Sequence, residues 1–212
     1  KRAEMFLPDQ WPAYYSKSKG CKVWDLDGNE FVDMSIMGIG TNILGYGHPE
    51  VDEAVMKVLQ SGNMSTFNCP EEVYLAEKLI KMHPWADMAR FARSGGEANA
   101  IAIRIARAAS GKDKVAICGY HGWHDWYIGS TARHLGVPDA VRGLTETFKY
   151  NDAESLETLL KNSPNEFSAV ILEPDGAVPV NSEFLQQVRG LTEKYGVVLI
   201  FDEIVTVFRI HT

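Results

Sequence analysis

The chain has 212 residues, 45% of them hydrophobic, so it can bury the core of one large globular domain plus a smaller appendage. A formal net charge of −7 and a pI near 5.4 argue against nucleic acid or an anionic membrane surface as a partner. The chain lacks both a run of about 20 apolar residues and the apolar core of a signal peptide, and its three scattered cysteines form no CxxC pair, which together predict a cytoplasmic protein with reduced thiols.

Residues 1–48 predict a small N-terminal segment built around a β-hairpin. Its two strands, residues 22–26 and 30–34, flank Asp27-Gly28, a pair that suits a two-residue turn because glycine tolerates positive φ. An irregular glycine-rich stretch follows, from Gly38 to Gly47.

Two helices are predicted next. The first begins at Pro49, because proline fits the first turn of a helix, and runs to Gly62. The second starts near Pro70 with the sequence EEVYLAEKLIKM.

From Met88 onward, strands are predicted to alternate with helices. A short strand and a glycine turn lead into a helix with one apolar side, made of Ala98, Ile101, Ala102, Ile105 and Ala109. Later helices have Asp152 as N-cap with Leu156, Leu159 and Leu160 inward, or begin at Asn181 or Ser182 and end at Gly196. The later strands are KVAIC, residues 147–150, SAVILEP and VVLIFDE. Strands so uniformly apolar predict an α/β domain with a mostly parallel sheet covered on both faces.

Polar and glycine residues stand where the apolar strands stop. In open parallel sheets, ligands bind outside the carboxyl ends of the strands. Four stretches occupy these places, namely Ser94 to Asn99, Gly119 to Gly122, Glu173-Pro174 and Asp202-Glu203. The sequence therefore predicts a binding site at this edge of the sheet.

The glycine turn and the aromatic residue each allow two interpretations. Gly95 and Gly96 enter a helix N-terminus, where unpaired N–H groups and the helix dipole favour an anion such as phosphate. The alternative is an ordinary strand-to-helix turn with Ser94 as N-cap. Tyr120 either lies flat against a planar ligand ring or is a core tyrosine with a satisfied hydroxyl group.

Asp202 directly follows a fully apolar strand, so its carboxylate requires a positive partner or several hydrogen-bond donors. That partner is either structural, an arginine or a helix N-terminus, or a protonated ring nitrogen of a cofactor that acts as an electron sink. Glu173 has a similar choice between orienting nearby groups and forming a salt bridge.

His121 and His124 form an H-x-x-H pair beside Asp125. No third ligand stands at a recognisable spacing and no HExxH is present, so no metal site is predicted. The sequence also lacks G-x-S-x-G and GxxxxGK[ST], which removes the main support for hydrolase and P-loop functions.

Taken in order, several motifs resemble class III aminotransferases, the fold-type I pyridoxal-phosphate enzymes, and most closely the glutamate-1-semialdehyde aminomutase branch. The motifs are VWDLDGNEFVDM, GYGHPEV, SGGEANAIAIRIARA, GYHGWHD, LEP and FDEIVTVFR. The resemblance implies an aspartate aminotransferase-like large domain, a homodimer with active sites near the subunit interface, and small-molecule amino donor and acceptor substrates. It also implies pyridoxal 5'-phosphate, bound as a Schiff base to a lysine.

Carried over to this chain, the resemblance implies that the amides of Gly95 and Gly96 hold the cofactor phosphate. Family members commonly have Ser or Thr at the position of Gly96, so one hydroxyl donor is missing here. The glycine-rich segment from Gly38 to Gly47 is implied to approach the substrate side.

The resemblance also implies which residues meet the cofactor ring. Tyr120 covers one face and Ile204 the other, while Asp202 pairs with the pyridine nitrogen. Asp202 and Glu173 are the catalytic candidates, with Glu173 orienting groups near the cofactor or substrate.

The family's Schiff-base lysine lies a few tens of residues beyond the DE motif and is therefore expected to be absent from this chain. Lys149 is the only lysine with a plausible approach, and its side chain is expected to be solvated or salt-bridged. We therefore expect residues 49–212 to be a partial large domain, without its C-terminal remainder, of an enzyme that transfers amino groups. Such a chain is expected to be inactive alone. The alternatives are a non-catalytic binding or regulatory pseudoenzyme, or another pyridoxal-phosphate reaction such as decarboxylation or racemisation.

Overall fold

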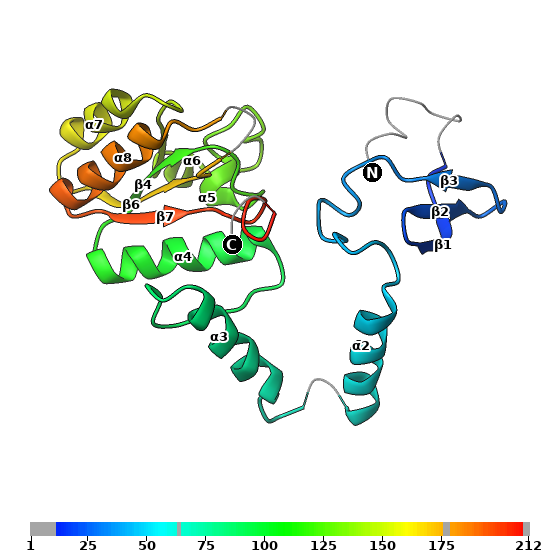
Figure 1. The fold of residues 1–212 in the computed structure, drawn as a ribbon. Helices are drawn as coiled ribbons and strands as arrows, with labels where there is room; N and C mark the ends of the chain where they lie inside the picture. Colours follow the sequence, from blue (N-terminus) through cyan, green and yellow to red (C-terminus); the bar gives the residue numbers. More distant parts are fainter. Residues whose placement is uncertain (1–11, 63–64, 176–178, 210–212) are drawn as a thin grey trace. The chain divides into compact units, whose positions relative to one another are not determined.

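A computed structural model describes residues 12–62, 65–175 and 179–209 of the chain (Figure 1). The chain divides into two compact units, Lys1–Pro70 and Glu71–Thr212, which are described separately below. In the described ranges, no helix has the length and apolar character needed to cross a membrane.

The first unit contains a three-stranded antiparallel sheet in the order β1-β2-β3, followed by one helix. Its elements are β1 (Tyr15–Lys19), β2 (Lys22–Asp25), β3 (Glu30–Val32) and α2 (Pro49–Ser61). The predicted hairpin is confirmed as β2 and β3, and α2 begins at its proline as predicted. Strand β1 was not predicted, because its polar sequence YSKSK has no apolar alternation.

The two-residue hairpin turn was wrong. The N–H of Asp25 donates to the carbonyl of Asn29 at 3.1 Å, so the loop is wider than two residues. The carboxylate of Asp25 accepts hydrogen bonds from the backbone N–H groups of Asp27 and Asn29, at 3.0 and 2.8 Å. A buried carboxylate with these donors organises the wider loop, and Gly28 keeps the expected positive φ of 85°.

The second unit is built on a four-stranded parallel sheet in the order β5-β4-β6-β7. Its strands are β4 (Lys114–Cys118), β5 (Thr145–Thr147), β6 (Phe167–Leu172) and β7 (Val198–Phe201). The parallel α/β architecture is confirmed. Strand β5 lies earlier than the predicted 147–150, because the chain after Phe148 turns toward the N-cap of the next helix. The strand predicted near Met88 does not form, since residues 88–93 pair with no described strand.

Helices lie on both faces of this sheet (Figure 1). The helices of this unit are α3 (Pro70–Met82), α4 (Gly95–Ser110), α5 (Asp125–Ile128), α6 (Asp139–Arg142), α7 (Ala153–Asn162) and α8 (Ser182–Tyr195). On one face, residues of α7 and α8 pack against β4 and β6; on the other, α4 and α5 do so. The sheet is therefore the middle layer of three, although the edge strand β7 leaves Val198 and Phe201 exposed.

The predicted boundaries of α7 and α8 rest on side-chain caps at their starts and, for α8, on a glycine at its end. Asp152 accepts from Ser155 N at 3.0 Å, and Asn181 accepts from Glu183 N at 2.9 Å. Gly196 ends α8 in the left-handed conformation, with φ of 61°.

The predicted inner side of α4 was wrong. Asn99, Ile103 and Ala106 are buried, whereas Ile105 is 58% exposed. The helix is rotated from the prediction because Asn99, a polar residue, faces the sheet and hydrogen-bonds there. This rotation places Asn99 in the candidate site.

Candidate active site

Three parallel strands bring polar residues to one edge of the sheet. Because β4, β6 and β7 run the same way, Cys118, Leu172 and Phe201 end level with one another. The ladder continues past them, with Glu173 N donating to Cys118 O at 3.3 Å and Asp202 N donating to Leu172 O at 2.9 Å. The strand-end residues predicted from the sequence therefore do meet at one edge.

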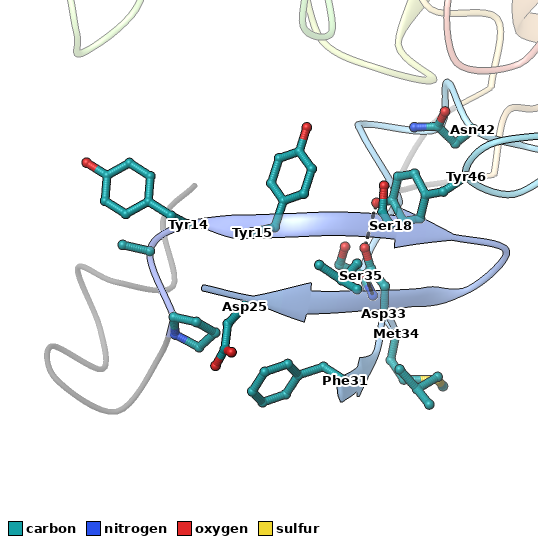
Figure 2. Close-up of a pocket in the computed structure, with 14 residues that line it drawn as sticks. Tyr14, Tyr15, Ser18, Asp25, Phe31, Asp33, Met34, Ser35, Asn42 and Tyr46 are labelled. Atoms are coloured by element: carbon teal, nitrogen blue, oxygen red, sulfur yellow. Dashed lines mark hydrogen bonds between the residues drawn. The ribbon is translucent and has the colours of Figure 1, made fainter. Parts of the chain in front are cut away.

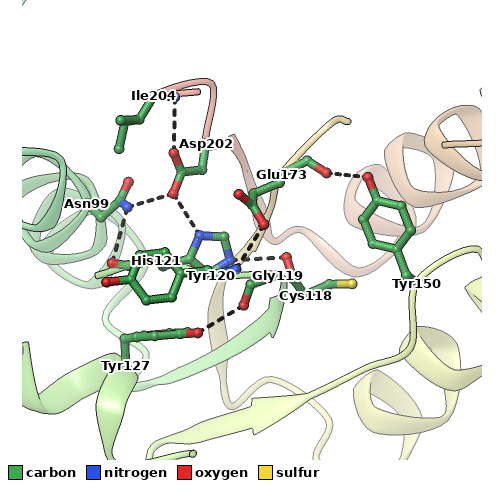
Figure 3. A network of polar contacts seen from close by, with 10 residues as sticks. All are labelled: Asn99, Cys118, Gly119, Tyr120, His121, Tyr127, Tyr150, Glu173, Asp202 and Ile204. Carbon is green, nitrogen blue, oxygen red and sulfur yellow. Dashed lines mark hydrogen bonds and ion pairs between the residues drawn. The ribbon is translucent and has the colours of Figure 1, made fainter. Parts of the chain in front are cut away.

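Asp202 is only 6% exposed, and donors surround its carboxylate (Figure 3). Its Oδ2 accepts from Asn99 Nδ2 and from His121 Nδ1, each at 2.8 Å. Its Oδ1 accepts only the backbone N–H of Ile204 among the described residues, at 3.2 Å. One carboxylate oxygen is therefore saturated by side chains, and the other retains accepting capacity.

The side chain that lies against the buried Asp202 carboxylate is His121, which is 1% exposed. Its second ring nitrogen, Nε2, lies 3.1 Å from the carbonyl oxygen of Cys118. Both ring nitrogens thus lie within hydrogen-bond distance of an oxygen atom. His121, Asn99 and the backbone of Ile204 together meet the need of the buried Asp202 carboxylate for several hydrogen-bond partners.

Aromatic rings enclose His121. The indole ring of Trp126 stacks on it with a centroid distance of 6.4 Å and an interplanar angle of 16°. Tyr127 meets it edge-on at 5.5 Å, and the Tyr127 hydroxyl donates to Gly119 O at 3.1 Å. Burial raises the pKa of Tyr127, so the phenol stays neutral and keeps donating.

Glu173 holds the loop that follows β4. Its Oε2 accepts the backbone N–H of Tyr120 at 2.9 Å (Figure 3). Gly119 precedes this contact with φ of 106°, and a Cβ there would lie 2.5 Å from Glu173 Oε2. The Glu173 carboxylate therefore occupies the space that a side chain at position 119 would need. Its hydrogen bond to the Tyr120 N–H holds the backbone of Tyr120 in place.

The ring of Tyr120 is 63% exposed, so this residue is not a core tyrosine. It meets Tyr127 edge-on, with ring centroids 5.6 Å apart. Much of the Tyr120 side chain is thus accessible to a ligand, which fits the role that the resemblance implies. Stacking on a cofactor stays a prediction.

The glycine pair opens α4. Ser94 caps the helix, its hydroxyl accepting from Glu97 N at 3.3 Å. Gly95 and Gly96 are the first two helical residues, whose N–H groups have no partner within a helix. A Cβ on Gly95 would lie 2.6 Å from Ile204 Cδ1, and a Cβ on Gly96 would lie 2.9 Å from His124 Cδ2. The space beside both glycines is therefore filled by other side chains, and the backbone N–H groups of the turn are available to a phosphate.

Sequence reasoning named Asn99 and His121 only as members of two strand-end stretches, with no role for Asn99 and only a rejected metal pair for His121. His121 uses both ring nitrogens within the protein, and His124 lies beside Gly96 instead. The described ranges contain no group of three or more metal-ligating side chains. The signal that would have found Asn99 is its position at the head of the stripe Asn99, Ile103 and Ala106, where a polar side chain on a buried face needs a partner.

Lys149 is exposed, and its backbone N–H donates to Ser155 Oγ at 2.9 Å. Its neighbour Tyr150 donates through its hydroxyl to Glu173 O at 2.9 Å, and burial raises the pKa of that phenol to about 12. Nothing in this geometry gives the Lys149 ammonium group a catalytic role.

A second hollow of about 890 Å³ lies in the first unit (Figure 2). Tyr14, Tyr15 and Phe31 line it with aromatic rings. Tyr46 donates to Asp33 Oδ2 at 2.7 Å, and this bond raises the pKa of Tyr46 to about 12 while helping to lower that of Asp33. Asn42, from the glycine-rich segment between Gly38 and Gly47, also lines this hollow. The approach of that segment to a substrate stays a prediction.

Comparison with known proteins gives one consistent match. The sequence profile of the Aminotransferase class-III family matches residues 8–209. The chain is 35% identical over 218 residues to 3-aminobutyryl-CoA aminotransferase of Cloacimonas acidaminovorans, covering 99% of this chain and 51% of that protein. It is 38% identical over 213 residues to glutamate-1-semialdehyde 2,1-aminomutase of Caldicellulosiruptor saccharolyticus, covering 94% and 49%.

Solved structures agree. An omega-transaminase from Sphaerobacter thermophilus superposes with a TM-score of 0.83 at 30% identity, covering 96% of this chain and 53% of that one. A transaminase with PLP bound gives a TM-score of 0.86 at 28% identity, covering 96% and 54%. The chain spans about half the length of the curated relatives it matches.

Proposed function

The chain belongs to the class-III aminotransferase family, whose cofactor is pyridoxal 5'-phosphate, and from this premise we propose that it supplies cofactor-binding elements of an enzyme that transfers amino groups. One observation carries the proposal. Asn99, on the helix that begins with Gly95 and Gly96, donates to Asp202. This bond joins a helix start suited to phosphate and a strand-end carboxylate suited to a charged ring nitrogen.

The residues present fit this cofactor. The close-fitting turn at Gly95 and Gly96 leaves backbone N–H groups that would bind the phosphate. Asp202 Oδ1 would accept a hydrogen bond from the protonated pyridine nitrogen, since Oδ2 is already occupied. When bound, the cofactor supplies the electron sink for carbanion chemistry at the amino-bearing carbon.

The remaining residues position the ring. Tyr120 and Ile204 would contact its two faces, and both are exposed in the chain as described. Glu173 would act by holding the backbone of Tyr120 in place, as its 2.9 Å hydrogen bond already does. Asp202 is thus the residue proposed to touch the cofactor chemically, and Glu173 is proposed as a positioning residue.

We further propose transfer between small-molecule amino donors and acceptors, or within one molecule, because the named relatives include an aminotransferase and an aminomutase. A polar amino acid or amino aldehyde is the proposed substrate class. The Schiff-base lysine is proposed to lie outside the residues of this chain. A homodimer is proposed from the family resemblance, and a cytoplasmic location is supported by three cysteines that form no disulfide.

The test uses the complete polypeptide from its source. Incubated with pyridoxal 5'-phosphate, it should develop visible absorption that shifts when an amino donor is added. Borohydride reduction followed by peptide mass spectrometry should locate the modified lysine outside this sequence. A protein that takes up no cofactor contradicts the proposal. Cofactor uptake without any lysine adduct or amine-induced shift supports the pseudoenzyme alternative, and loss of carbon dioxide or of chirality from the substrate supports the other reactions.

A further inference from the structure

The imidazole of His124 occupies the space that a side chain at position 96 would need. A Cβ on Gly96 would lie 2.9 Å from His124 Cδ2 and 3.2 Å from its Nε2. Gly96 is the second residue of α4, and its φ lies outside the left-handed region. The backbone at Gly96 therefore tolerates a side chain, and the obstacle to one is the His124 ring.

The loop holding His124 is fixed against the start of α4. A Cβ on Gly122, which has φ of 107°, would lie only 3.0 Å from Gly96 Cα. One residue earlier, His121 is held by Asp202 and by the carbonyl of Cys118. The loop therefore has little freedom to carry the His124 ring away from Gly96.

Neither a hydrogen bond within the described residues nor a metal site with His121 accounts for the position of the His124 ring. It is half-buried and tilts against Trp123 with a centroid distance of 4.9 Å; His124 is the N-cap residue of α5, but its side chain makes no capping hydrogen bond. Within the described residues, no hydrogen bond to either of its nitrogens is found. It cannot share a metal ion with His121, whose two nitrogens are both engaged. A polar ring without a protein partner thus lies beside the unpaired N–H groups of a helix start.

We infer that His124 is a phosphate ligand of the cofactor, its imidazole N–H donating to a phosphate oxygen bound at Gly95 and Gly96. The inference rests on the proposed function. It gives the site the side-chain donor that glycine at position 96 cannot provide. Imidazole and backbone amide donors then act on one anion, and charge-assisted hydrogen bonds of this kind are stronger than neutral ones.

The test compares two ligands, pyridoxal 5'-phosphate and pyridoxal, which lacks the phosphate. Equilibrium binding to the complete protein is measured for wild type, His124→Ala, His124→Gln and His134→Ala. His124→Ala should weaken binding of pyridoxal 5'-phosphate by about 10- to 100-fold, the loss expected for one hydrogen bond to a charged group. Pyridoxal binding should not change. His124→Gln, which keeps an N–H donor, should lose less affinity.

His134→Ala is the matched control, because His134 is a half-buried histidine whose Nδ1 lies 2.8 Å from Thr131 O, away from the glycine turn in sequence. It should bind both ligands as wild type does. The ³¹P resonance of the bound cofactor should move in His124→Ala and stay in place in the control. A wild type that binds neither ligand contradicts the proposed function, whereas equal effects of His124→Ala on both ligands, or no effect, overturn the inference alone.

A second variant pair keeps the test informative if His124→Ala folds poorly. Gly96→Ser alone should weaken binding of pyridoxal 5'-phosphate, since its Cβ meets the His124 ring. Combined with His124→Ala, the serine hydroxyl enters the vacated space and should recover at least part of the affinity. If the double variant binds no better than either single variant, the shared space does not hold a phosphate donor and the inference fails.

Discussion

His121 Nδ1 donates to Asp202 Oδ2 at 2.8 Å, although the two residues follow strands that are not neighbours in the sheet. His121 comes after β4 and Asp202 after β7, with β6 between them. The bond passes over the end of β6, and Asn99 adds a third element by donating to the same oxygen. Two strand ends and a helix are therefore fixed to one carboxylate.

Replacement of Asp202 tests this arrangement. Asp202→Ala removes the oxygen that pairs with both His121 Nδ1 and Asn99 Nδ2 in the interior and should lower the free energy of unfolding by about 3 to 5 kcal/mol, as for other broken buried pairs. Asp202→Asn should cost less, because its amide oxygen still accepts from His121 and Asn99. The measurement is urea unfolding followed by far-UV circular dichroism. Equal stability of the two variants would show that an acceptor for His121 and Asn99 at position 202 does not contribute to stability.

Gly119 and Glu173 provide a second test. Gly119→Ala combines a positive φ of 106° with a Cβ 2.5 Å from Glu173 Oε2. We expect it to lower the free energy of unfolding by about 1 to 3 kcal/mol from backbone strain, plus the cost of displacing the carboxylate. The measurements are thermal unfolding and cofactor binding. Both the Tm and the affinity for pyridoxal 5'-phosphate should fall.

Gly136→Ala separates the two costs of that substitution. Gly136 also has a positive φ, 91°, but an added Cβ there meets nothing within 4 Å. It should show the strain alone and keep cofactor affinity. Gly119→Ala should lose more stability than Gly136→Ala, and this difference should shrink when Glu173→Ala is added to Gly119→Ala. If the difference persists in the double variant, the contact with Glu173 is not its cause.

The sequence predicted the parallel sheet and most helix boundaries, because these depend on local signals. Asp152, Asn181 and Gly196 end or begin helices through bonds within a few residues. The errors came where tertiary contacts decide. The position of β5 depends on pairing with β4, and the expected strand near Met88 found no partner among the described strands.

The sequence predicted where the residues of the candidate site lie in the fold, but not which residues form hydrogen bonds with them. Strand ends identify Glu173 and Asp202 because an apolar run that stops at a carboxylate is visible in one sequence. The partners of Asp202 lie 81 and 103 residues away along the chain, at His121 and Asn99. No local pattern encodes such a distance, so only the packing of α4 and the β4–α5 loop reveals them.

Cysteine labelling gives a third prediction. Burial raises the pKa of the Cys118 thiol to about 12 from an ordinary value of 9.0, so the thiolate fraction at pH 8 falls about a thousandfold. Cys21 and Cys69 are exposed. Iodoacetamide at pH 8 should therefore label two cysteines in the native protein and all three after unfolding, counted by peptide mass spectrometry over this chain. Rapid native labelling of Cys118 would contradict its burial.

The last prediction concerns stability in acid and the ion pair between α7 and α8. Glu157 pairs with Lys194 at 2.7 Å and with Lys161 at 3.0 Å, and these ammonium groups lower its pKa to about 2. A lowered folded-state pKa means that the unfolded chain binds its proton first, so the stabilisation is complete above the ordinary value near 4.5 and is lost as the pH falls to about 2. Glu157→Gln should flatten the fall of Tm in this window, although solvent and salt keep the effect small. Glu154→Gln, on the same helix and without an ion pair among the described residues, should keep the wild-type slope. Identical slopes for the two variants would mean that the Glu157 pair does not contribute.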